Sequence, residues 1–147
     1  MKRYLGLMIF VLTSMALPTQ QSFACSCLPT SVQGAYKDSS VIFVGEVADA
    51  KYITESTSLD DKEAIHWEEV EVYFKIDKLY KGKTEVLDLA LRTADNSAAC
   101  GYQFDVGEKY LVYAYVVDGQ IATNLCTRTS PLKSKQAQSD IKWLQGS

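Results

Sequence analysis

The sequence is poor in the residues that most enzyme active sites require. Its 147 residues include a single histidine, His66, and lack the G-x-S-x-G, phosphate-loop and H-E-x-x-H motifs. Nucleophilic catalysis by cysteine normally needs a histidine base, and His66 has no cysteine or second histidine near it in the sequence. We interpret His66 as a surface residue at the start of a strand, and we do not expect an enzyme.

No charge of one sign dominates the chain. The 15 lysine and arginine residues face 18 aspartate and glutamate residues, so no basic surface for a nucleic acid is expected. Hydrophobic residues make up 47% of the chain, which excludes a disordered or collagen-like protein. We find no linker, repeat or low-complexity segment after residue 24, and this indicates one domain over residues 25–147.

The sequence also lacks an apolar run long enough to span a bilayer. Residues 4–17 are largely apolar but fall short of the ~20 residues that a membrane helix needs. They follow Lys2 and Arg3 and precede a short polar stretch, which is the pattern of a secretory signal peptide. We therefore predict a signal peptide over residues 1–24 and a secreted protein, extracellular or periplasmic, that begins at Cys25.

A lipoprotein leader is the alternative interpretation of this segment. Cys25 would then carry the lipid, and the membrane would be a partner only in that case. Such leaders usually have leucine three residues before the cysteine, where this chain has Ser22. The small residues Ser22 and Ala24 instead suit ordinary cleavage before Cys25.

Short-range patterns predict strands along most of the remaining chain. The β-branched and aromatic run Val41–Val47 indicates a buried strand, and apolar residues alternate with polar ones over Val70–Ile76. Between them, Lys51–Glu69 is polar and acidic, and we expect a long projecting hairpin loop with a solvated face. Further strands are expected at 87–91, 110–117 and 120–125, the last two joined by a tight Asp118-Gly119 turn.

Two helices are expected at the ends of the domain. Residues 30–39 suggest a short helix capped by Thr30 or Ser31. Residues 134–144 place apolar side chains at i, i+4 and i+7, which is typical of an amphipathic helix that packs on a sheet. At least five strands without a repeated β-helix-β pattern predict a mainly β protein, a small antiparallel barrel or sandwich.

The four cysteines, at positions 25, 27, 100 and 126, are candidates for disulfide bonds in an exported protein. A bond between Cys25 and Cys27 would close a very tight ring. The other two pairings each tie the N-terminus to Cys100 and Cys126, and the residues alone do not choose between them. A zinc site made of the same four cysteines is a further alternative, although the chain has no C-x-x-C pair.

The chain has Cys25-Ser26-Cys27 at its predicted mature N-terminus, a long hairpin expected after the first strand, and then Ser97-Ala98-Ala99-Cys100-Gly101-Tyr102. In this combination it resembles the tissue inhibitors of metalloproteinases and the wider netrin-like domain family. Cys25-Ser26-Cys27-Leu28-Pro29 resembles the C-x-C-x-P opening of that family, and Phe74–Gly82 resembles its second strand and following turn. Asn124-Leu125-Cys126 resembles the segment that carries a later cysteine. The similarity covers nearly all of residues 25–147.

The resemblance implies a five-stranded OB-type barrel with flanking helices and disulfides Cys25–Cys100 and Cys27–Cys126. It also implies a secreted or surface zinc metalloproteinase as partner, with no cofactor of the protein's own. In such inhibitors the free amine and carbonyl oxygen of the first cysteine chelate the zinc of the target, and here that residue is Cys25. No other residue of the chain would contact a metal.

Residue by residue, the resemblance implies a wedge and an adjacent ridge that contact the protease. Ser26 would enter the first primed pocket, and Cys27, Leu28 and Pro29 would continue the wedge. The ridge on the unprimed side would be formed by Asn96, Ser97, Ala98 and Ala99, which precede Cys100. The Lys51–Glu69 segment would add peripheral contacts.

The chain also departs from the vertebrate members of the family. With four cysteines in these 147 residues, we expect neither the third disulfide of this domain nor the further cysteine-rich domain, and the leader suits a bacterial export signal. Netrin-like domains also occur in proteins that inhibit nothing, because function depends on the site and not on the fold. The alternative function is therefore a protein-binding module stapled by the same disulfides, with tyrosines of the 110–115 strand as a contact surface.

Overall fold

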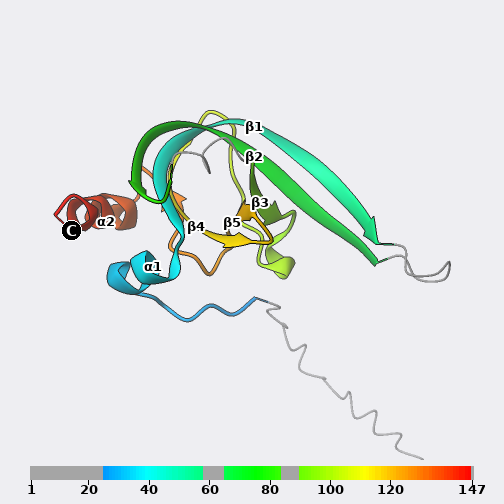
Figure 1. Ribbon diagram of the computed structural model, residues 1–147, viewed down its shortest axis with the longest axis horizontal. Helices are drawn as coiled ribbons and strands as arrows, with labels where there is room; N and C mark the ends of the chain where they lie inside the picture. The colour runs from blue at the N-terminus through cyan, green and yellow to red at the C-terminus, as the bar shows by residue number, and fades with distance from the viewer. Residues whose placement is uncertain (1–24, 58–64, 84–89, 147) are drawn as a thin grey trace, which may run out of the picture.

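The computed structural model describes residues 25–57, 65–83 and 90–146, and within them five strands close into an OB-type barrel (Figure 1). Neighbouring strands follow the order β1-β2-β3-β5-β4, and β4 pairs again with β1. All pairs are antiparallel except β3 with β5. The strands are β1 (Val41–Thr57), β2 (Ile65–Lys81), β3 (Leu91–Ala94), β4 (Lys109–Val117) and β5 (Gln120–Ala122), and β6 (Ser130–Pro131) extends the sheet at β4.

The first two strands are much longer than predicted. The projecting loop expected over Lys51–Glu69 is wrong for most of its length, because β1 continues to Thr57 and β2 begins at Ile65. Residues 58–64 lie outside the described residues. Opposite charges explain part of the pairing: Lys51 lies opposite Glu71, and its Nζ lies 4.8 Å from the centroid of the Tyr73 ring. The polar composition of these residues, which predicted a loop, comes from side chains on a two-stranded ribbon.

Irregularities in β1 allow this strand to close the barrel. The register with β2 shifts at three places between Ile42 and Asp49, as β-bulges do. Bulges bend a strand, so β1 can pair with β4 over Val41–Glu46 while remaining paired with β2. Figure 1 shows the far half of the β1–β2 ribbon extending away from the two helices.

The hydrophobic core has two parts, one inside the barrel and one beneath the helices. Side chains of β1 alternate between them: Phe43 points into the barrel, and Ile42 faces the helices. Aromatic rings fill the barrel in edge contacts, for example Phe43 with Phe74 and Phe104 with Tyr110 at 5.2 and 4.9 Å. Tyr110 and Tyr113 of β4 are buried, so these two tyrosines do not form the contact surface expected for a binding module.

Both predicted helices are confirmed. Helix α1 (Val32–Asp38) begins after Ser31, whose hydroxyl accepts a hydrogen bond from the Gly34 amide at 3.1 Å. Helix α2 (Lys135–Leu144) is capped in the same way by Ser134. The buried residues of α2 are Ala137, Asp140 and Leu144, so an acidic residue lies on its apolar face.

The hairpin between β4 and β5 is also confirmed. Asp118 and Gly119 both have positive φ angles, 49° and 79°, as a tight turn of this kind requires. β5 ends at Ala122 and does not reach Leu125 as expected, because the following threonines bond to one another and to β4. Of the strand expected at 87–91, Leu91 lies in β3, while residues 84–89 are outside the described residues.

We predict that the half-buried Tyr102 makes the fold sensitive to alkali. Burial raises the pKa of Tyr102 from 10.0 to about 12, with smaller contributions from Tyr110 and Asp105. Because the folded pKa is the higher one, this contribution to stability is complete below pH 10 and is lost between pH 10 and 12. Tyr102→Phe should therefore make the fall of the melting temperature over this range less steep.

Thermal unfolding between pH 8 and 11.5 measures this effect. Tyr52→Phe is the matched control, because Tyr52 is 78% exposed. Equal slopes for the Tyr102 and Tyr52 variants would contradict the prediction.

Candidate functional site

The N-terminal strap, residues 25–30, is joined to the barrel by two disulfide bonds. Cys25 pairs with Cys100 and Cys27 with Cys126, with Cα–Cα distances of 5.2 and 4.9 Å. This is the pairing that the family resemblance implied. Because both bonds together use all four sulfur atoms, no thiolate remains for the alternative zinc site or for a catalytic cysteine.

The two disulfides lie side by side. The Cys25 Sγ atom is 3.8 Å from the Cys126 Sγ and 3.9 Å from the Cys27 Sγ. Three segments that are far apart in the sequence therefore meet at one place: the strap, residues 96–100 and residues 124–126. The bonds link residues 75 and 99 positions apart, and each stabilises the fold by roughly 4 kcal/mol in the loop-entropy account.

The ridge, residues 96–99, is a single turn of 3-10 helix over Ser97–Ala99 that the sequence analysis did not predict. The Asn96 side chain caps the turn by accepting a hydrogen bond from the Ala99 amide at 2.9 Å. Cys100 ends it in the left-handed conformation, with φ 63°. All four ridge residues are exposed, so the turn presents them to solvent beside the Cys25–Cys100 bond.

Gly101 holds the ridge close to β3. Its amide donates to the Asn96 carbonyl at 2.8 Å, and a Cβ at this position would lie 2.0 Å from the Ala94 carbonyl oxygen. Only glycine permits so close an approach of two backbone segments.

A third segment, residues 124–126, contributes to the same surface, and only its Cys126 was among the predicted site residues, as a disulfide partner. The Leu125 amide donates to the Cys100 carbonyl at 2.8 Å, which fixes the 124–126 segment against the ridge. Asn124 Oδ1 accepts from the Cys126 and Thr127 amides at 2.8 and 3.2 Å. The sequence feature that could have predicted a role for Leu125 in this surface is its position next to a disulfide-bonded cysteine.

Exposed apolar side chains gather on this surface. Leu28 is 89% exposed and Leu125 is 40% exposed, although leucine is usually buried. Ser26 and Pro29 are exposed beside them. Apolar side chains held in solvent and surrounded by polar groups are typical of a surface that binds another molecule.

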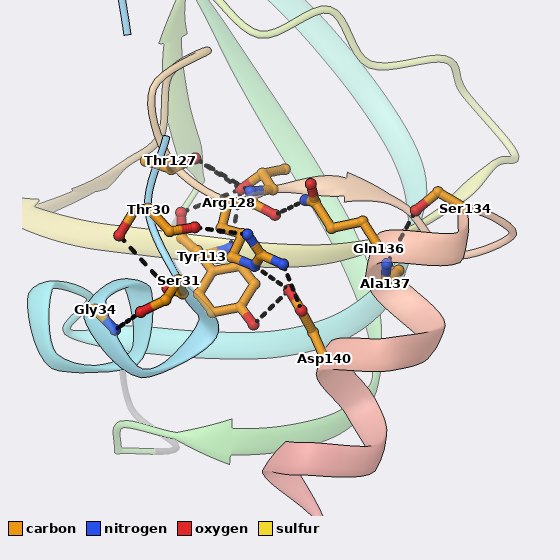
Figure 2. Close-up of polar contacts among 11 residues, drawn as sticks. Thr30, Ser31, Gly34, Tyr113, Thr127, Arg128, Ser134, Gln136, Ala137 and Asp140 are labelled. Carbon is orange, nitrogen blue, oxygen red and sulfur yellow. Dashed lines mark hydrogen bonds and ion pairs between the residues drawn. The ribbon is translucent and has the colours of Figure 1, made fainter. Parts of the chain in front are cut away.

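A buried polar cluster lies behind the strap (Figure 2). Asp140 of α2, 1% exposed, accepts two hydrogen bonds from Arg128, at 2.7 and 2.9 Å, and one from the Tyr113 hydroxyl at 3.1 Å. Arg128 also donates to the Thr30 carbonyl at 2.7 Å. The hydrogen bond with Asp140 raises the pKa of Arg128, and burial followed by the Asp140 charge raises that of Tyr113.

Sequence reasoning missed this cluster. The signal was Asp140 itself, an acidic residue on the apolar face of α2 between Ala137 and Leu144, which needs a buried partner. The partner, Arg128, lies in a segment for which no element was predicted. The remaining candidate, His66, is the second residue of β2, and its side chain is outside what the structure describes.

We predict that Gly101→Ala displaces the ridge. The added methyl group would overlap the Ala94 carbonyl, so the mutation should destabilise the fold by about 3 kcal/mol and leave part of the protein with free thiols at Cys25 and Cys100. Thermal unfolding and thiol titration measure the two effects. Gly146→Ala is the control, because its Cβ would meet nothing closer than 3.8 Å, and equal behaviour of the two variants would contradict the prediction.

Within the described residues, no helix is both long enough and apolar enough to cross a bilayer. A comparison with curated proteins found no match. The sequence does match the family described as Tissue inhibitor of metalloproteinase, over residues 23–142. The match includes the strap, the ridge, the 124–126 segment and both disulfides, and it spans most of the chain. The chain therefore belongs to the tissue inhibitor of metalloproteinase family.

Proposed function

We propose that the protein is a secreted inhibitor of zinc metalloendopeptidases that acts through its N-terminal residue. Removal of the signal peptide before Cys25 would free the α-amino group of this residue. The amine nitrogen and the carbonyl oxygen of Cys25 would then bind the catalytic zinc of the target. Family membership supports inhibition of metalloproteinases in general, and the Cys25 mechanism is the specific part of the proposal.

The chemistry of Cys25 suits this role. The N, Cα, C and O atoms of one residue form a five-membered ring with a metal, and catalytic zinc keeps one position open for an external ligand. An α-amino group has a pKa of about 7.7–8.0, so the neutral amine is accessible near physiological pH. Displacing the zinc-bound water would remove the nucleophile that attacks the substrate.

The observation that carries the proposal is the pair of adjacent disulfides at the strap. They attach Cys25 and Cys27 to the barrel while Ser26, Leu28 and Pro29 remain exposed. A segment fixed in this way loses little conformational entropy on binding. A rigid, exposed strap is what an inhibitor that enters an active-site cleft requires.

The other exposed residues define the rest of the proposed contact surface. Ser26 would enter the first primed pocket, and Leu28 and Pro29 would continue along the primed side. The ridge would occupy the unprimed side, and Leu125 would add an apolar contact between the two. The β1–β2 ribbon would contribute peripheral contacts through residues that include Glu68 and Glu69.

We predict that a protein beginning at Ala24 folds but does not inhibit. The extra residue converts the Cys25 amine into an amide, which is a poor zinc ligand, and leaves both disulfides in place. Inhibition of a panel of zinc endopeptidases, measured beside a protein beginning at Cys25, tests this. Equal potency of the two proteins with equal melting temperatures would disprove the chelation mechanism.

The natural terminus decides whether the mechanism is available. Intact mass and N-terminal sequencing of the exported protein should show an unmodified Cys25 and a mass lowered by the four hydrogen atoms that two disulfides remove. A lipidated or displaced terminus would remove the chelating group but keep the stapled scaffold. That result would favour the alternative function, a non-inhibitory netrin-like binding module.

Leu28 tests the contact surface independently of the zinc. Because Leu28 is 89% exposed, Leu28→Ala should change the free energy of unfolding by less than about 0.5 kcal/mol. It should raise the inhibition constant about tenfold, as loss of an interface anchor does. Val106→Ala, at a 63% exposed position in the loop before β4, is the control. Unchanged inhibition by the Leu28 variant would exclude this residue from the interface.

A further inference from the structure

The strap has open space on both of its sides. A cavity of about 560 Å³ lies between residues 26–30 and a wall that includes Asp38 and Tyr115. A second cavity of about 300 Å³ separates residues 27–30 from a wall that includes Leu125 and Gln136. Packing against the barrel therefore does little to fix the direction of the strap beyond Cys27.

One hydrogen bond provides the restraint on the strap that packing does not. Arg128 Nη1 donates to the Thr30 carbonyl oxygen at 2.7 Å. In the described part of the chain, no other hydrogen bond joins residues 26–30 to the barrel or to α2. The strap is thus attached at Cys25, Cys27 and Thr30. Residue 30 continues through Ser31 into α1, so residues 28–30 form a short bridge between Cys27 and that helix, and the Arg128 hydrogen bond fixes the orientation of the backbone within this bridge.

Arg128 is itself held rigidly. Its Nε and Nη2 atoms donate to the two carboxylate oxygens of Asp140, which leaves Nη1 directed at the strap (Figure 2). Gln136 of α2 donates to the Arg128 carbonyl at 2.9 Å. Charge-assisted, bidentate pairs of this type fix a guanidinium in one orientation, because their geometry is planar and strict.

We propose that Arg128 is a positioning residue for inhibition. Held by Asp140 of α2, it fixes the Thr30 carbonyl and so sets the direction in which Leu28 and Pro29, between Cys27 and Thr30, face the target. Arg128 does not touch the protease in this account and acts only through the strap. The inference rests on the proposed inhibitory function, to which it adds a residue that the Cys25 mechanism does not name.

Arg128→Lys separates this role from the burial of Asp140. Lysine keeps a positive charge beside the carboxylate, so Asp140 is not left as an unpaired buried charge. A single ammonium lacks the planar fork that serves both carboxylate oxygens and the Thr30 carbonyl. Arg92→Lys is the matched control, because Arg92 pairs with Glu71 at 3.0 Å on the barrel, away from the strap.

Two readouts are needed, the inhibition constant and the mobility of the strap. For Arg128→Lys we expect an inhibition constant about tenfold higher, the cost of ordering a loosened segment on binding. The backbone amide order parameters of Leu28 and Thr30 should fall from about 0.85 toward 0.6. Arg92→Lys should change neither quantity, and the melting temperatures of the three proteins should agree within a few degrees.

Wild-type inhibition and wild-type order parameters from Arg128→Lys would overturn the proposal. A mobile strap in the wild-type protein would overturn it without any variant. If Arg128→Lys does not fold, Asp140→Asn provides the second test, because it keeps the acceptor for Tyr113 but weakens the hold on Arg128.

Failure of the proposed function can be distinguished from failure of the Arg128 proposal. If the processed wild-type protein inhibits no zinc endopeptidase, both the function and the positioning role for inhibition are wrong. The order parameters then still decide whether Arg128 orders the strap for another partner.

Discussion

Two adjacent disulfide bonds are the constraint on which the proposed site depends. They bring residues 25–27, the turn at residues 96–100 and the loop at residues 124–126 into contact around four sulfur atoms. None of these segments belongs to a regular strand of the barrel. Without the bonds, the segment that carries the exposed Leu28 and Ser26 would not be held against the barrel, and an ordered binding surface would not form.

Contacts between polar groups fix the parts of the proposed binding surface that the disulfide bonds do not hold. The Asn96 cap and the Gly101 contact with Ala94 shape the ridge, and Arg128 with Asp140 holds the end of the strap. A buried charged pair contributes little net stability, because its desolvation cost offsets the attraction. Its effect here is orientation, since the arrangement of donors and acceptors permits only one direction for the Arg128 side chain.

Local patterns were reliable where a few neighbouring residues decide the structure. The two helices, a Thr30 or Ser31 cap for α1, the Asp118-Gly119 turn and the β4 strand were all predicted, because each depends on residues within a few positions. The Lys51–Glu69 loop was wrong for the complementary reason. Its polar residues form strands through cross-strand partners such as Glu71 and Tyr73, about 20 residues away, which composition does not reveal.

Sequence patterns were enough to predict the mainly β class, the two helices, the hairpin, and the C-x-C opening through which the family resemblance entered. They did not determine which sulfur atoms pair, because bonds across 75 and 99 positions depend on how the barrel folds. Nor did they place Leu125 beside the ridge or Arg128 behind the strap. Those contacts join segments whose relative positions are set by strand order and barrel closure, so they follow from the folded barrel and from no local pattern of residues.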